Sequence, residues 1–385
     1  MRVLVAAPAG IGHVHPLLPL TLALRDRGHD VLFAVAAEHE SAIDGLGIRS
    51  AAAGLPLQVR LARALELAGV DPRALLPRAQ ADVGFPFGFG AAGMPVMLDE
   101  LRPIATAHRP DVILHDVGEL ASPLLAAELG VTHIAHSFGT TPPSTRLAKA
   151  GELTAHLWEQ SGLPQPPFAG VFNDVYVDIR PDGLAGHPPA GTRVVRERPA
   201  SLDALGGDVP DPVTEPSDLP LVYATLGTNF TALQVLRTLA EAVDGLPVRA
   251  LLTVGPRGEP DALGAVPPNV HVERYVPQAR VLPLCDLVVS HAGSGTFLGA
   301  LAHGLPQVCL PQGADQFLNA DAGRDAGVAI ALEPADATAE AIRSAVEQLL
   351  ASPSYRASAG RLADEIAAMP TADEVAGELE EIVGA

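Results

Sequence analysis

The sequence contains a single lysine, Lys149, among its 25 basic residues, and no glycine run precedes it. A Walker-type phosphate loop places a lysine beside its glycines, so this class of nucleotide-binding site is excluded unless Lys149 supplies that charge. A lysine Schiff-base enzyme would likewise have only Lys149 as its reactive lysine. The chain has 45 acidic residues, and its net charge of −20 disfavours nucleic acids and anionic membranes as partners.

Cysteines and long apolar runs are equally scarce. Cys285 and Cys309 lie inside apolar stretches, which predicts buried thiols in a reducing compartment and neither a disulfide nor a metal site. No stretch approaches the roughly 20 apolar residues that cross a bilayer. The apolar start, residues 1–8, runs into a glycine turn and is explained better by a strand than by a signal peptide. We therefore expect a soluble, cytoplasmic protein without membrane insertion.

The chain has 385 residues, 48% of them hydrophobic, which is enough for two domains with separate cores. Short apolar runs alternate with helical patterns, as is typical of parallel sheets built from βαβ units. The expected strands span residues 3–7, 31–36, 112–114 and 132–135 in the first half and 221–224, 250–254, 286–290 and 307–310 in the second. The predicted fold class is α/β, with two facing Rossmann-like doubly wound parallel sheets and a cleft between them.

A stretch rich in proline, glycine and aspartate begins at Gly206 and continues to Pro220 without periodicity, which is typical of an interdomain linker. We expect one domain over residues 1–212 and a second over residues 213–365. The helical pattern over residues 366–385 predicts a C-terminal helix that is able to pack back on the first domain.

In open α/β sheets, ligands bind beyond the carboxyl ends of the strands. Five of the expected strands are followed there by small or polar residues. These segments are residues 10–16, 115–116, 225–229, 291–296 and 311–316. Their convergence on the same edges of the sheets predicts where the functional site lies.

His13 follows the first expected strand and begins the first helix. The positive end of that helix disfavours the imidazolium, which keeps the ring neutral and able to accept a proton. Asp116 follows another strand of the same sheet and could hold the second ring nitrogen. A base with an orienting carboxylate is the arrangement of a catalytic dyad.

Dinucleotide binding is an alternative for the same segment. Gly10 and Gly12 would form the tight turn, and Glu38, after the second strand, would bind the ribose. His15 stands where the third glycine of that fingerprint belongs, so the fit is poor. The pair of His13 and His15 lacks the acidic or cysteine partner that a metal site needs, and no metal is expected.

Residues 291–296, a histidine followed by Ala-Gly-Ser-Gly-Thr, connect a strand to a short helix that is closed by Gly304. Glycines let a ligand approach the backbone closely, and the first free N–H groups of a helix bind phosphate without a lysine. His291 can donate a further hydrogen bond to a phosphate oxygen. A plain glycine turn would show the same pattern, so this stretch alone leaves both interpretations open.

Residues 84–90 hold three of the ten phenylalanines, Phe85, Phe87 and Phe89, in a loop-like setting. An apolar loop tucked against its own domain would account for them, since scattered apolar side chains are common at surfaces. Alternatively, the three rings form a wall for a flat, apolar ligand.

These segments together resemble the GT-B-fold, inverting nucleotide-sugar glycosyltransferases, in particular the actinobacterial enzymes that decorate antibiotics and other natural products. The resemblance spans essentially the whole chain, and no single motif carries it. It is strongest in Gly12-His13-Val14-His15-Pro16, in residues 275–278 and 284–296, in Gly304-Leu305-Pro306 and in residues 311–316.

The resemblance implies a role for each matching residue. The first domain would bind the acceptor, with His13 as general base, Asp116 as its acidic partner, and Phe85, Phe87 and Phe89 facing the acceptor. The second domain would bind the donor. Val276 and Gln278 would contact the nucleobase, and Asp315 and Gln316 would bind the sugar hydroxyls. The phosphates would be bound by Gly227, Thr228, His291, Gly293, Ser294, Gly295 and Thr296. Gly12 of the first domain would also contact the donor.

One departure bears on the donor. Relatives that use UDP-sugars typically carry a glutamate eight residues after the phosphate-loop histidine, where it binds the ribose hydroxyls, and this chain has Gly299 there. A donor without the 2′-hydroxyl would not miss that contact, whose loss costs about 1.5–3 kcal/mol. The resemblance therefore implies a dTDP-sugar, with a UDP-sugar as the alternative.

The implied reaction transfers a deoxysugar to a hydroxyl of a hydrophobic small-molecule aglycone, by one in-line displacement with inversion. No cofactor or metal is expected, and Asp-x-Asp occurs nowhere in the chain. The alternatives are a sugar-nucleotide epimerase or hydrolase on the same architecture and a non-catalytic partner of a related transferase. A homodimer is compatible with the sequence, which assigns no surface to it.

Overall fold

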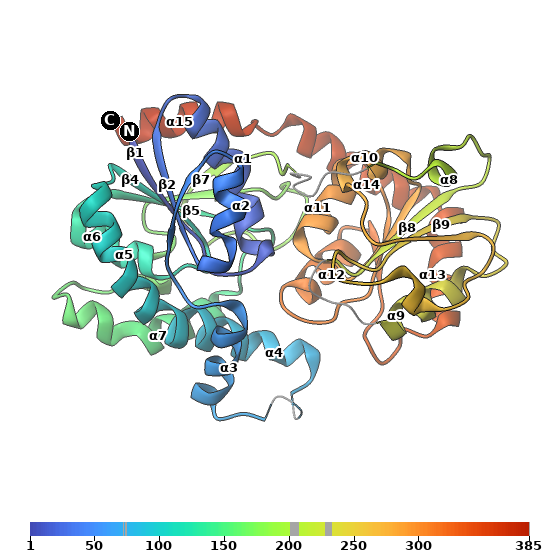
Figure 1. Ribbon diagram of the computed structural model, residues 1–385, viewed down its shortest axis with the longest axis horizontal. Helices are drawn as coiled ribbons and strands as arrows, with labels where there is room; N and C mark the ends of the chain where they lie inside the picture. Colours follow the sequence, from blue (N-terminus) through green and yellow to red (C-terminus); the bar gives the residue numbers. More distant parts are fainter. Residues whose placement is uncertain (72, 74, 201–207, 228–232, 385) are drawn as a thin grey trace. The chain divides into compact units, whose positions relative to one another are not determined.

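The computed structural model describes residues 1–71, 73, 75–200, 208–227 and 233–384 (Figure 1). The chain divides into two compact units, each built on its own parallel sheet, which confirms the predicted α/β class. The first unit comprises Met1–Arg180, Gly186–Arg198 and Met369–Ala385, and the second comprises Pro181–Ala185 and Pro199–Ala368. Within the described ranges, no helix is long and apolar enough to cross a membrane.

The sheet of the first unit has seven parallel strands in the order β3-β2-β1-β4-β5-β6-β7. The strands expected from the first half of the sequence form its centre, where side chains are buried on both faces. The strands are β1 (Arg2–Ala6), β2 (Asp30–Val35), β3 (Arg49–Ala52), β4 (Val112–Asp116), β5 (Thr132–His136), β6 (Val175–Asp178) and β7 (Arg193–Arg196). Ala6 pairs with His115, so β1 and β4 end side by side.

Helices connect these strands and cover the sheet. They are α1 (Ile11–Asp26), η1 (Ala37–His39), α2 (Glu40–Gly45), α3 (Leu57–Ala68), α4 (Pro77–Val83), η3 (Gly84–Gly93), α5 (Met94–His108), α6 (Ala121–Leu129), α7 (Ser144–Gln160), η4 (Pro167–Gly170) and α15 (Ala372–Gly384). On one face, side chains of α5 and α6 pack against Leu4, Ala6 and Ile113 in the main apolar core of the unit.

The phenylalanine-rich segment is helical, and the expected loop is wrong. Element η3 is a π-helix that joins α4 directly to α5. Its glycines permit close packing: a Cβ on Gly90 would lie 3.3 Å from the Cβ of Ala150 in α7. Tertiary contact with α3 and α7 thus outweighs the turn-like composition of this stretch. π-Helical turns are rare and frequently occur at functional sites.

The sheet of the second unit has six parallel strands in the order β10-β9-β8-β11-β12-β13. The strands are β8 (Leu221–Thr225), β9 (Arg249–Thr253), β10 (Val270–Glu273), β11 (Leu287–Ser290), β12 (Gln307–Cys309) and β13 (Ala329–Ala331). The helices are α8 (Asp211–Thr214), α9 (Leu233–Val243), η5 (Pro260–Leu263), α10 (Gln278–Val281), η6 (Leu282–Leu284), α11 (Ser294–Ala302), α12 (Gln316–Asp325), α13 (Ala339–Ala351) and α14 (Pro353–Ala368). Apolar side chains of α9 and α13 cover one face, and those of α10 and α11 cover the other.

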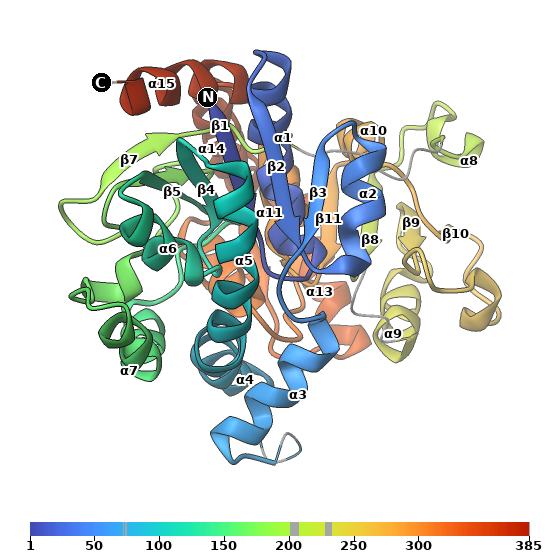
Figure 2. The ribbon, with the colours of Figure 1, turned by 60° about the vertical axis from the view of Figure 1, so that its left-hand side comes forward.

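The C-terminal helix α15 packs on α1 of the first unit (Figure 2). Glu380 accepts hydrogen bonds from Arg27 at 2.8 Å and is 2.7 Å from Nε2 of His29. Val375 and Leu379 are buried on the inner face of the helix. Where the chain re-enters the first unit, the backbone N–H of Arg198 donates to the carbonyl of Pro370 at 2.7 Å.

Candidate functional site

His13 lies in the first turn of α1, shortly after β1 ends. Gly10, directly before the helix, has a φ of 134°, a conformation that glycine adopts without strain. Its carbonyl oxygen accepts hydrogen bonds from the backbone N–H groups of His13 at 3.0 Å and Val14 at 3.1 Å. Gly12 is exposed, and a Cβ there would meet no atom within 4 Å, so the backbone beside His13 is open to a ligand.

The imidazole of His13 is held by a buried carboxylate. Its Nδ1 lies 3.0 Å from Oδ1 of Asp116, at the end of the neighbouring strand β4. Oδ1 also accepts a hydrogen bond from the backbone N–H of Gly118 at 2.7 Å, and the Asp116 side chain is 1% exposed. Because a carboxylate only accepts, Nδ1 is the nitrogen that donates, and in the neutral ring Nε2 then carries the lone pair. The His13 side chain is 18% exposed, so the arrangement suits proton abstraction from a ligand.

Two phenylalanines contact the His13 ring edge-on. The ring centroids lie 4.9 Å from Phe89 and 4.8 Å from Phe138. Phe85 is buried behind Phe89 at 5.2 Å, whereas Phe87 is half-buried. Of the three predicted acceptor residues, the structure therefore brings only Phe89 into ring contact with His13, and Phe85 packs against Phe89.

Sequence reasoning missed Phe138. It follows β5, whose end lies beside that of β4, since Asp116 pairs with His136. The position of Phe138 just beyond a strand end was the only indication in the sequence that it could lie at the site. That indication was too weak for a prediction, because the packing of residues far apart in sequence decides which ring faces His13.

Glu119 is a second residue that sequence reasoning missed. It is 3% exposed, and its carboxylate accepts hydrogen bonds from the backbone N–H groups of Ala121 at 2.7 Å and Ser122 at 3.0 Å. It therefore satisfies two N–H groups at the start of α6 and holds the turn that follows Asp116. Burial raises the pKa of Glu119 to about 7, and the nearby Asp116 charge acts in the same direction.

In the second unit, His291 lies between β11 and α11 with its ring enclosed by two glycines. A Cβ on Gly227 would lie 2.7 Å from Cε1 of His291, and one on Gly293 would lie 2.5 Å from Nε2. Neither position accepts a side chain unless the ring moves. Burial lowers the pKa of His291 to about 4, against a weaker opposing effect of Asp315, so the ring is neutral at pH 7.

The N-terminus of α11 follows directly. Gly293 precedes the helix, and the backbone N–H groups of its first residues, Ser294, Gly295 and Thr296, have no acceptor within a helix. Gly295 is exposed and a Cβ there would meet nothing within 4 Å. Such an end is suited to bind an anion.

A hydrogen-bonded cluster joins this turn to α12. Oδ2 of Asp315 accepts from Oγ of Ser294 at 2.6 Å and from Nδ2 of Asn319 at 3.0 Å. Nδ2 of Asn319 also lies 2.9 Å from the carbonyl oxygen of Ala292, which has a φ of 61°. A left-handed alanine costs free energy and persists where its surroundings hold it, as they often do at functional sites. Asn319 was not identified from the sequence, because its role depends on contacts across two loops.

The remaining predicted donor residues differ in access. Gln278 donates from Nε2 to Oγ1 of Thr296 at 3.1 Å and is half-buried. Val276 is 1% exposed inside the apolar core, so only its backbone can meet a nucleobase. Gln316 is 2% exposed, and its Oε1 accepts from the backbone of Gln312 at 2.7 Å. Thr228 lies outside the described residues.

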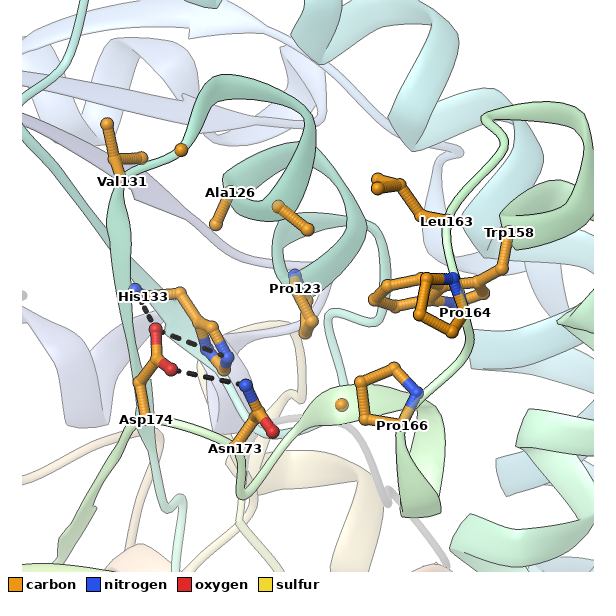
Figure 3. Close-up of a pocket in the computed structure, with 13 residues that line it drawn as sticks. Pro123, Ala126, Val131, His133, Trp158, Leu163, Pro164, Pro166, Asn173 and Asp174 are labelled. Carbon is orange, nitrogen blue, oxygen red and sulfur yellow. Dashed lines mark hydrogen bonds and ion pairs between the residues drawn. The ribbon is translucent and has the colours of Figure 1, made fainter.

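A separate cavity of about 320 Å³ lies near the amino-terminal ends of strands β5 and β6 of the first sheet (Figure 3). His133 near the start of β5, Asp174 before β6, and the Trp158 ring line it. Oδ2 of Asp174 accepts from the backbone N–H of His133 at 3.0 Å. Because the strands are parallel, the cavity lies away from the strand ends that carry His13 and Asp116. No group of three metal-binding side chains occurs within the described residues.

Comparison with known proteins places the chain in a family. The family model described as erythromycin biosynthesis protein CIII-like, C-terminal domain, matches residues 238–382. The L-demethylnoviosyl transferase of Streptomyces niveus is 32% identical over 391 residues, covering 98% of this chain and 97% of the relative. Elloramycin glycosyltransferase ElmGT of Streptomyces olivaceus is 32% identical over 407 residues, covering 100% and 98%.

The solved structures agree. Spinosyn rhamnosyltransferase SpnG, determined with thymidine diphosphate and with the spinosyn aglycone, superimposes with a TM-score of 0.81 at 27% identity. The match covers 99% of this chain and 100% of that chain. Relatives at 32% identity over almost their whole length and a shared fold show that the chain belongs to the GT-B glycosyltransferases of actinobacterial antibiotic biosynthesis.

Proposed function

We propose that this glycosyltransferase moves a deoxysugar from a dTDP-sugar to a hydroxyl of a hydrophobic natural-product aglycone, with inversion at the anomeric carbon. The observation that carries the proposal is the 3.0 Å contact between Nδ1 of His13 and Asp116, which leaves Nε2 available to accept a proton. A positioned base of this kind contributes about 10²–10⁴-fold to the rate.

In the proposed step, Nε2 of His13 takes the proton of the acceptor hydroxyl while the hydroxyl oxygen bonds to the anomeric carbon. The bond from that carbon to the phosphate oxygen breaks on the opposite face, and dTDP leaves with the bonding electrons. Asp116 stabilises the imidazolium that forms. Attack on one face with departure from the other inverts the configuration.

The leaving diphosphate is assigned to the N-terminus of α11 in the second unit. The backbone N–H groups of Ser294, Gly295 and Thr296 would stabilise its charge as it develops. The neutral His291 ring would donate one further hydrogen bond. Asp315 and Asn319 hold this turn in place, which supports a preorganised site.

The choice of dTDP rests on Gly299. This residue lies in α11, one helix with the proposed phosphate site, where a Cβ would lie 3.3 Å from Cδ1 of Leu282. No carboxylate is present there to bind a ribose 2′-hydroxyl. The binding of thymidine diphosphate by the relative SpnG supports the same assignment.

The acceptor is assigned to the aromatic surroundings of His13. Phe89 and Phe138 lie edge-on beside the proposed base. Phe85 and the half-buried Phe87 lie in the same π-helix, η3, as Phe89. Such rings favour a flat, apolar aglycone. The complex of SpnG with spinosyn aglycone and the name of the elloramycin enzyme support a small-molecule acceptor of this kind.

The first test is thermal unfolding with dTDP and with UDP at matched concentrations. A nucleotide at 100 times its dissociation constant should stabilise the protein by about 2.7 kcal/mol. Larger stabilisation by dTDP than by UDP supports the donor assignment, and larger stabilisation by UDP overturns it. If neither nucleotide stabilises the protein, the assignment of the phosphate site is wrong.

The second test follows nucleotide release from a dTDP-deoxysugar with and without a panel of aromatic aglycones. Release that requires an aglycone supports transfer. Release of equal rate without an aglycone indicates a hydrolase or epimerase. Unchanged activity of the protein in its pathway after His13→Ala would indicate a non-catalytic partner.

A further inference from the structure

Two arginines are buried in the described part of the first unit, and they differ in their partners. Arg180 is 1% exposed and forms an ion pair with Asp178 at 2.9 Å. Arg60, in α3, is 4% exposed; its Nη2 donates to the carbonyl oxygen of Ala9 at 2.9 Å, and no ion pair holds it within the described residues. Its Nη1 is buried without a hydrogen-bond partner there. A buried guanidinium without a paired carboxylate is destabilising, so its presence calls for a reason.

The contacts of Arg60 lead directly to the proposed base. Its guanidinium carbon lies 4.0 Å from the centroid of the Phe89 ring, and that ring lies 4.9 Å from the His13 ring. The two distances place the guanidinium within about 9 Å of the imidazole. Its other anchor, Ala9, immediately precedes the Gly10 turn that positions His13.

Arg60 retains its charge at neutral pH. Burial lowers the pKa of its guanidinium to about 10, and the charges of Asp116 and Glu38 oppose that shift. The buried Asp116 carboxylate, 3.0 Å from Nδ1 of His13, and the Arg60 guanidinium are therefore opposite charges near the same imidazole. A cation at this range acts on His13 through a medium that screens it less than water does.

We propose that Arg60 is a positioning residue for His13, which fixes the turn before α1 and the Phe89 ring and whose positive charge favours the neutral imidazole. The inference rests on the proposed function of His13 as the base. It adds a second control on that base: Asp116 orients the ring and favours the imidazolium, and Arg60 limits how readily the imidazolium forms.

The other charged groups near the His13 turn are few. Nε2 of His39 lies 3.2 Å from the backbone nitrogen of Gly10, and Glu38 lies 3.7 Å from His39. Burial and, more weakly, the neighbouring His39 lower the pKa of His15, which lies on the same helix as His13. None of them is in ring contact with His13, whereas Phe89 links Arg60 to it directly.

The experiment is an NMR titration of the His13 ring in the free protein, which is independent of turnover. Removing the cation with Arg60→Gln or Arg60→Met should raise the midpoint of the His13 titration by about 0.5–1.5 pH units. Arg63→Gln, which removes an exposed cation from the same helix, is the matched control. A shift no larger than that of the control overturns the proposal.

Arg60→Lys separates charge from position. Lysine keeps the charge but lacks the planar fork that reaches Ala9 while lying over Phe89. We expect the midpoint to stay near that of the wild-type protein, with kcat lowered about tenfold. A raised midpoint in Arg60→Lys, or an unchanged kcat, overturns the proposal even if the uncharged variants do not fold. If no variant and no wild-type protein transfers sugar while the midpoint shifts as expected, the proposed function fails and the electrostatic inference stands.

Discussion

The His13 turn of the first unit and the His291 turn of the second share one local design. In each, a parallel strand leads through a turn that contains a glycine into a helix. His13 lies in the first turn of α1, after the glycine, whereas His291 directly follows β11 and precedes Gly293 and α11. Their chemistry differs because of what lies against the ring. His13 meets the carboxylate of Asp116 and keeps an available Nε2, whereas His291 is enclosed by Gly227 and Gly293 and stays neutral. We propose on these grounds that the ring is a base in the first unit and a hydrogen-bond donor in the second.

The largest expected effect removes the base and leaves the donor site intact. His13→Ala should lower turnover by about 100-fold or more, because the acceptor hydroxyl loses its proton acceptor. Binding of dTDP, measured by calorimetry, should remain unchanged. His156→Ala, which removes an exposed histidine of the same unit, is the control. If His13→Ala keeps its turnover, the two turns do not differ in the way proposed.

The next prediction concerns the His291 turn of the second unit. In Gly293→Ala, the new Cβ would lie 2.5 Å from Nε2 of His291 and displace the ring. Affinity for dTDP should fall by about tenfold or more, the value of a lost hydrogen bond to a charged oxygen. Gly360→Ala, where a Cβ meets nothing within 4 Å, should bind normally and serves as the control. Undiminished affinity in Gly293→Ala would show that the ring has no part in nucleotide binding.

A smaller effect is expected from placing a carboxylate in α11. Gly299→Glu should shift the ratio of UDP to dTDP affinity toward UDP by about tenfold, since a ribose hydroxyl gains a charged acceptor. The crowding is slight, because the new Cβ would meet only the end of the Leu282 side chain at 3.3 Å. Gly299→Gln has nearly the same shape without the charge and should shift the ratio less. An unchanged ratio in both variants would end the argument for dTDP from this position.

The smallest expected effect is that of pH on dTDP affinity. The pKa of His291 is lowered to about 4, so its ring stays neutral as the pH falls from 8 to 6. We therefore expect dTDP affinity to change little over that range, once ionisation of the nucleotide itself is accounted for. A clear loss of dTDP affinity over that range would contradict a neutral His291 ring.

Much of the fold could be predicted from the sequence. The central strands of both sheets are apolar and buried on both faces, so they stand out in the sequence without any knowledge of their neighbours. Five strands were missed. The edge strands β3, β7, β10 and β13 are short and only partly buried, and β6 is buried but only four residues long. Their structure is stabilised by pairing with an existing sheet more than by their own composition.

The site was predictable where a residue's place along the chain decides its position. His13, Asp116 and His291 all stand at or near strand ends, and the ends of adjacent parallel strands lie together. The places of Phe138, Arg60 and Asn319 could not be predicted, since each depends on a contact with another loop or helix. Arg60 in particular has the sequence context of an ordinary helical arginine and is distinguished only by its burial over Phe89.

The sequence alone predicted the class of fold and the places of the two histidine turns, because periodic burial and glycine turns are properties of short segments. The family was inferred from the resemblance of several motifs along the chain, and the relatives confirm it. The tertiary structure decided which groups face each ring: the Asp116 carboxylate and two phenylalanines around His13, and the glycines around His291. It also decided that η3 is a helix. The physical reason is that protonation and packing depend on distances of a few ångströms, and only the folded chain sets those between residues remote in sequence.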